Sequence, residues 1–139
     1  MKKRTLFAGL LAGLVLFVAS MAFGYLVNFV FPGLQAEYAN FAIFRPWDDP
    51  LMMLYFLYPF VLSFVLAWFW QKASRLFEGP TWKMALSLTW VYFLMATVPG
   101  MLITYSSFQV SGLMTLSWTI TGFVQVFFAS LVLVKMVKN

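Results

Sequence analysis

Three long runs without a charged residue constrain this chain more than any other feature. They cover residues 5–36, 51–71 and 84–134. A helix needs about 20 mostly apolar residues to cross a hydrocarbon core of about 30 Å, so the first two runs each fit one span and the third fits two. The sequence therefore predicts an all-α integral membrane protein: a single domain, residues 1–139, folded as a four-transmembrane-helix bundle.

The charged and turn-forming residues between the runs set the expected boundaries. We expect spans at about residues 5–31, 51–70, 82–104 and 110–134, and an outer interfacial loop at 32–50. With 63% hydrophobic residues and a mean hydropathy of +0.89, the chain is too apolar for a soluble domain of this size. Almost nothing remains outside the membrane to form a second domain.

The N-terminal segment shares features with a secretory signal, because basic residues 2–4 precede an apolar run. That run continues to Phe31, well beyond the roughly 7–15 residues of a signal core. We therefore expect an uncleaved first span, ended by Pro32 and Gly33.

Several functions are excluded by the residue types that the chain lacks. It has no cysteine and no histidine, which removes thiolate chemistry and the commonest metal and haem ligands. Apart from Lys83 at the very start of the third, no expected span contains an ionisable Asp, Glu, Lys or Arg, which argues against proton-coupled transport. The basic residues form no continuous face for nucleic acid. We predict no catalytic residue, no metal site, no cofactor and no nucleic-acid partner.

The 32–50 loop gathers three of the chain's 4 acidic residues and one arginine. If a binding site lies outside the membrane, we expect it there, and the candidate residues are Glu37, Arg45, Trp47, Asp48 and Asp49. Aromatic residues recur at every third position of the same loop, which favours one short helical stripe on the membrane surface: Tyr38, Phe41, Phe44 and Trp47.

Two local patterns in this loop predict particular contacts. Asp49 precedes Pro50, which is typical of a helix start, because the carboxylate caps free N–H groups and proline at the first position loses no helical bond. We expect Arg45 to pair with Asp48 or Glu37 and to hold the loop against the bundle. A second reading, in which these groups form a binding or catalytic site, stays open.

Small and amide residues at helical spacing mark the expected packing faces. They are Gly9, Gly13, Gly24 and Asn28 on the first span, and Gly122 and Gln125 on the fourth. Small residues let helix backbones approach closely in lipid, and the amides can hydrogen-bond between helices. The first face fits packing within the chain or a homodimer. Pro59 should bend the second span, and Pro99 should kink or end the third.

Two stretches, EYANFAIFRPWDDPLMMLYFLYPF and VPGMLITYSSF, resemble those of small uncharacterised four-helix proteins of the bacterial inner membrane. The resemblance implies the fold and a location in that membrane. It carries over no functional residue.

Together these features favour a non-enzymatic protein, an accessory or assembly subunit or a scaffold of a larger membrane complex. Its expected partners are membrane lipid and other membrane subunits or further copies of the chain. Aromatic residues make up 21% of the sequence and supply broad contact surfaces. One alternative is a protein that binds a lipid or quinone-like molecule between the second and third helices. Another is a membrane enzyme that uses the loop carboxylates.

The distribution of basic residues predicts the orientation. Of the 9 Lys and Arg residues, only Arg45 lies in the 32–50 loop, and the others flank the opposite ends of the spans. Because cytoplasmic segments carry the excess of basic residues, both termini should be cytoplasmic. A reporter fused after Asn139 should behave as cytoplasmic, and a tag within residues 39–42 should be labelled from outside. Reversed labelling would contradict this topology.

Overall fold

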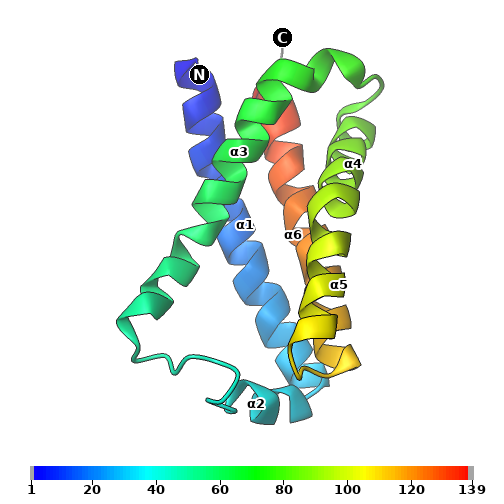
Figure 1. Cartoon of the computed structure of the whole chain (residues 1–139). Helices are drawn as coiled ribbons and strands as arrows, with labels where there is room; N and C mark the ends of the chain where they lie inside the picture. The colour runs from blue at the N-terminus through cyan, green and yellow to red at the C-terminus, as the bar shows by residue number, and fades with distance from the viewer. Residues whose placement is uncertain (1, 138–139) are drawn as a thin grey trace.

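The computed structural model describes residues 2–137, and it confirms four helices that are long and apolar enough to cross a membrane (Figure 1). The described residues contain no strand. The first span is α1 (Lys3–Val30), followed by the short α2 (Gly33–Tyr38). The second span consists of η1 (Pro50–Phe56), α3 (Tyr58–Ala73) and η2 (Ser74–Leu76). The third consists of α4 (Thr81–Tyr92), η3 (Phe93–Thr97) and α5 (Val98–Ser107). The fourth is α6 (Gly112–Met136).

Both chain termini lie at one end of the bundle, which we call the termini end (Figure 1). The short helix α2 and the loop that follows it lie at the other end, the loop end. Helix α6 packs on α1 and on α4, and α1 also packs on α3. The pair α1 and α6 therefore forms the middle of the bundle, with α3 against α1 and the third span against α6.

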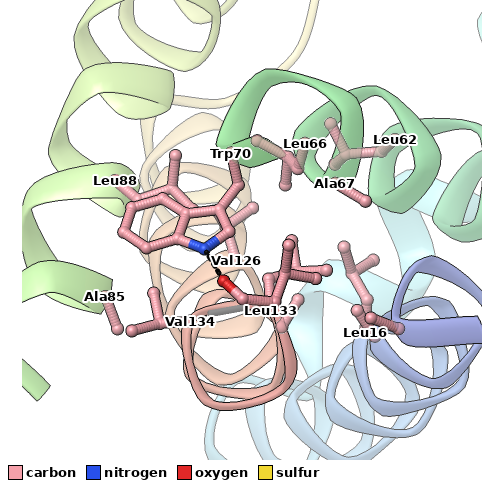
Figure 2. Close-up of a cluster of buried hydrophobic side chains, with 14 residues drawn as sticks. Leu16, Leu62, Leu66, Ala67, Trp70, Ala85, Leu88, Val126, Leu133 and Val134 are labelled. Atoms are coloured by element: carbon pink, nitrogen blue, oxygen red, sulfur yellow. Dashed lines mark hydrogen bonds between the residues drawn. The ribbon is translucent and has the colours of Figure 1, made fainter. Parts of the chain in front are cut away.

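The main core fills the termini half and surrounds Trp70 of α3. The Trp70 side chain is 2% exposed, and Figure 2 shows it lying toward Leu88 of α4 and Val126 of α6. Its indole Nε1 donates a hydrogen bond to the backbone oxygen of Val137, at the end of α6, over 2.9 Å. Trp70 thereby joins three spans, although α3 and α4 make little direct backbone contact.

Two glycines of α1 allow α3 to lie close to it. A Cβ atom on Gly9 would stand 2.7 Å from the Phe64 ring, and one on Gly13 would stand 2.7 Å from the Phe60 ring and 2.8 Å from the Ser63 hydroxyl. No real Cβ tolerates such distances. The expected close contact is therefore present here, within the chain.

The same packing face does not extend to Gly24. No atom lies within 4 Å of the position that a Gly24 Cβ would take, and Asn28 is only half-buried. Both residues lie beyond the level at which α3 packs on α1. Helical spacing alone placed Gly24 and Asn28 on the packing face, but at their level α3 has already moved away from α1.

The second span changes its helix type before it reaches the loop end. The bend expected at Pro59 is a break at Leu57, where the 3₁₀ helix η1 gives way to α3. Proline restricts the residue before it and lacks an N–H, so an α-helix cannot run smoothly through this point. None of the η1 side chains is buried, and the Phe56 ring contacts Phe17 of α1 at 6.0 Å between centroids.

The third span passes Pro99 without ending. A π-helical turn, η3, precedes the proline, and the N–H of Val98 donates to the oxygen of Phe93. The wider turn absorbs the interruption that a proline makes in the hydrogen-bond ladder. Of the two outcomes expected at Pro99, the helix is therefore modified rather than ended, and α5 continues to Ser107.

The face of α6 toward the third span is only partly the one expected. A Gly122 Cβ would make an ordinary 3.6 Å contact with Thr97, and Ser130 meets the Thr89 hydroxyl at 3.4 Å. Gln125 is 7% exposed, but its Oε1 atom has no hydrogen-bond partner within residues 2–137. The interhelical bond that we expected from this oxygen is absent there.

The glycine geometry predicts unequal effects of one substitution at two sites. Gly13→Leu should lower the free energy of unfolding by about 1–3 kcal/mol, because the new side chain would overlap Phe60 and Ser63. Gly24→Leu, with open space around it, should leave thermal unfolding in mild detergent almost unchanged. Equal destabilisation at Gly24 would contradict this packing and point to a contact outside the chain.

Candidate functional site at the loop end

Helix α2 lies across the loop end and is tied to the start of α6. The Glu37 Oε2 atom accepts a hydrogen bond from the backbone N–H of Ser111 over 3.1 Å, and the Tyr38 hydroxyl accepts one from the Trp118 indole. The Ser111 hydroxyl in turn caps α6 by accepting from the N–H of Met114. Glu37 is thus engaged in a structural bond with α6, and not with Arg45.

An apolar cluster beneath α2 supports these bonds. Its buried members are Leu34, Val110 and Met114. The rings of Tyr38, Phe44 and Trp118 pack around it, with centroids 5.3 to 6.2 Å apart. Partial burial raises the pKa of the Tyr38 hydroxyl, and the hydrogen bond from the Trp118 indole partly offsets this rise.

Asp49 both caps η1 and pairs with Arg45, whereas we expected these two roles from different acidic residues. Its Oδ1 accepts from the N–H of Leu51 over 2.8 Å, which confirms the expected cap. Its Oδ2 lies 2.8 Å from the Arg45 Nη1, so the partner of Arg45 is Asp49 and the expected pairing with Asp48 or Glu37 is wrong. The Leu51 hydrogen bond and then the Arg45 guanidinium lower the pKa of Asp49.

The other two candidate residues face outward. Trp47 is 70% exposed, and its ring packs edge to face with the Tyr55 ring, at 5.9 Å between centroids. Asp48 is exposed and has no ion pair in the part of the chain that the structure describes. The expected single aromatic helix is also absent, because α2 ends at Tyr38 and residues 39–49 form turns.

The five candidate residues therefore do not converge on one pocket. Glu37 serves α6, the pair of Arg45 and Asp49 serves η1, and Asp48 and Trp47 lie on the surface. Across residues 2–137, no three acidic side chains lie close enough together to hold a metal ion. The hydrogen bonds and the ion pair of the loop end hold its segments together, and its carboxylates are not arranged as an acid–base pair.

Two hollows lie elsewhere, and the sequence pointed to neither. One, of about 370 Å³, lies at the termini end and is lined by Lys2, Gln71, Lys72 and Arg75. The other, of about 420 Å³, is a shallow apolar groove along α1, lined by Leu14, Val15, Val18, Ala19, Ala22, Phe23 and Phe128. The basic residues of the first were assigned only to membrane orientation, because their convergence depends on the packing of α1 against α3.

Comparison of the chain with protein-family models, curated proteins and solved structures finds no match. The resemblance to small four-helix inner-membrane proteins stays a prediction.

The lowered pKa of Asp49 predicts a dependence of stability on pH. The ionised carboxylate stabilises the folded loop, so its contribution is present above the ordinary pKa of 3.8 and is lost as pH falls through the lower folded value. Asp49→Asn should therefore lower the unfolding temperature at neutral pH, and the difference from wild type should shrink in acid. Asp48→Asn, which alters an exposed carboxylate with no ion pair among residues 2–137, is the matched control. A difference that persists unchanged in strong acid would contradict the assignment.

Proposed function

We propose that this protein is a non-enzymatic accessory or assembly subunit of a larger complex in the bacterial inner membrane, with both termini in the cytoplasm. The observation that carries the proposal is the unequal burial of the spans. Only 11% of the apolar window of the third span is buried inside the chain, against 39% for the fourth. The third span thus offers most of its length to lipid or to another protein.

The exposed face of the third span is broad and apolar. Its most exposed large side chains are Leu94, Met95, Leu102 and Ile103, between 60% and 76% exposed. Leu94 and Met95 lie within the π-helical turn η3, and the other two lie beyond it in α5, so the turn gives this face a fixed irregular shape. Association of helices in lipid depends on shape and close packing, since burying apolar groups against lipid or protein differs little. An irregular apolar face of fixed shape therefore favours association with a protein surface of complementary shape.

An aromatic cluster joins the third span to α6. The rings of Trp90, Phe93 and Phe123 pack edge to face, with centroids 5.0 to 5.5 Å apart. Such contacts fix the orientation of the third span on α6, where the π-helical turn begins. The surface that a partner meets is thereby held in one shape, which lowers the entropy lost on binding.

The acidic groups support a non-enzymatic role. Glu37 and Asp49 are already occupied by a backbone N–H and by Arg45, and of the described carboxylates at the loop end only Asp48 is without such a contact. A catalytic pair needs two groups whose environments set different pKa values around one substrate position. The loop end offers one exposed carboxylate instead.

A second candidate function rests on the apolar groove along α1. Its volume of about 420 Å³ suits part of an acyl or isoprenoid chain, as a lipid- or quinone-binding protein requires. The groove lies on α1 and not between the second and third helices, where we expected such a site. It is open along its length, so it does not enclose a ligand as a dedicated pocket does.

Site-specific photo-crosslinking in native membranes tests the proposed function. A photoreactive residue at Leu102 or Ile103 should give one discrete product with another membrane protein, whereas the same residue at Val18, which is 63% exposed, should give only lipid adducts. Lipid adducts alone at all three positions would contradict the proposal.

A product of twice the chain mass would replace the accessory role with a homodimer. A small molecule retained in stoichiometric amount in native mass spectrometry, and lost in Ala19→Phe, would favour the groove.

A further inference from the structure

The basic hollow at the termini end joins residues that are far apart in the sequence. Lys2 precedes α1, and Lys72, at the end of α3, is followed by Arg75 in η2. These segments meet because Gly9 and Gly13 allow α3 to approach α1 at this end. The result is a space of about 370 Å³ with three cationic side chains around it.

These cations have no carboxylate partner within residues 2–137. The ion pair of the described chain, Arg45 with Asp49, lies at the opposite end of the bundle. Like charges around one hollow repel one another, and the repulsion is removed when an anion enters. The arrangement therefore has the electrostatics of an empty anion site rather than of a salt-bridge network.

Two further features at the same place favour an anion. Lys2 is the N-cap residue of α1, and no side chain caps this helix start. The free N–H groups and the positive end of the helix dipole thus lie beside the hollow. Gln71 also lines the hollow; its buried Oε1 has no hydrogen-bond partner within residues 2–137, and its amide group carries two N–H donors. Every polar side chain of the lining can then donate a hydrogen bond.

The depth of the hollow indicates the source of the anion. It opens where the apolar part of α3 ends, shortly after the exposed Trp68. Tryptophan is enriched at the boundary between hydrocarbon and headgroups, and basic residues at that boundary attract anionic lipids. A phosphate group at this level belongs most readily to a phospholipid.

We propose that Lys2, Gln71, Lys72 and Arg75 form a binding site for a phosphate-bearing anion, supplied by the headgroup of an anionic phospholipid. The lysines and the arginine bind the phosphate oxygens by charge-assisted hydrogen bonds. The Gln71 amide adds a neutral hydrogen-bond donor. This site goes beyond the proposed accessory role and does not depend on it.

Lipid titration followed by native mass spectrometry tests the site. Wild-type protein in mild detergent should retain phosphatidylglycerol in preference to phosphatidylcholine. The double variant Lys72→Gln, Arg75→Gln should retain phosphatidylglycerol roughly 30-fold more weakly, from two basic residues near an anionic headgroup. Arg4→Gln, Lys83→Gln is the matched control, because it removes two charges from exposed positions outside the lining. It should leave the preference unchanged.

A second variant and a second ligand make the result decisive. Gln71→Glu keeps the shape of the side chain but places a carboxylate in the hollow, so it should also abolish the preference. Thermal unfolding without lipid should not move to a lower temperature, because the carboxylate offsets the repulsion among the cations. If inorganic phosphate binds to wild type and no lipid preference exists, the anion is free phosphate and the lipid source is wrong. If the control pair weakens binding as much as the lining pair, or if neither ligand binds, the site itself is wrong.

Discussion

The hydrogen bond from the Trp70 indole to the oxygen of Val137 ties the end of α6 to α3 and to the neighbouring α4. Lipid is as apolar as leucine, so burying apolar side chains does little to hold helices together in a membrane. Close packing and hydrogen bonds must do so. The oxygen of Val137 lies just beyond the end of a helix, where carbonyl groups have no partner in their own helix, and the indole supplies one in a buried position.

The two halves of the bundle are consequently held by different means. The termini half has a dense core in which Ala8, Ala12 and the two α1 glycines allow the backbones to approach. Among the described residues, the loop half has only the smaller cluster of Leu34, Val110 and Met114. The second span leaves α1 at the break at Leu57. Its order comes from α2, whose Glu37 and Tyr38 bind α6 across the end of the bundle.

The sequence predicted the features that depend on local chemistry. The absence of charge located the spans, and the Asp49–Pro50 pair located the start of the second one, because both signals are contained within a few neighbouring residues. Other features depend on the path of a second segment. Helical spacing placed Gly24 on the same face as Gly13, but it could not tell where α3 diverges. The partner of Arg45 depended on a turn that returns Asp49 toward it.

The π-helical turn η3 also bears on how this chain can vary in length. A π-helical turn holds one more residue than the α-helical turn it replaces, and the flanking helices keep their directions. In this chain it lies between α4 and α5, and both of these helices pack on α6. A single-residue insertion or deletion elsewhere in the span would rotate everything beyond it away from α6. Within residues 93–97 the loss of one residue would convert the π-helical turn into an ordinary α-helical turn, so the chain can be shortened there while α4 and α5 keep their packing on α6.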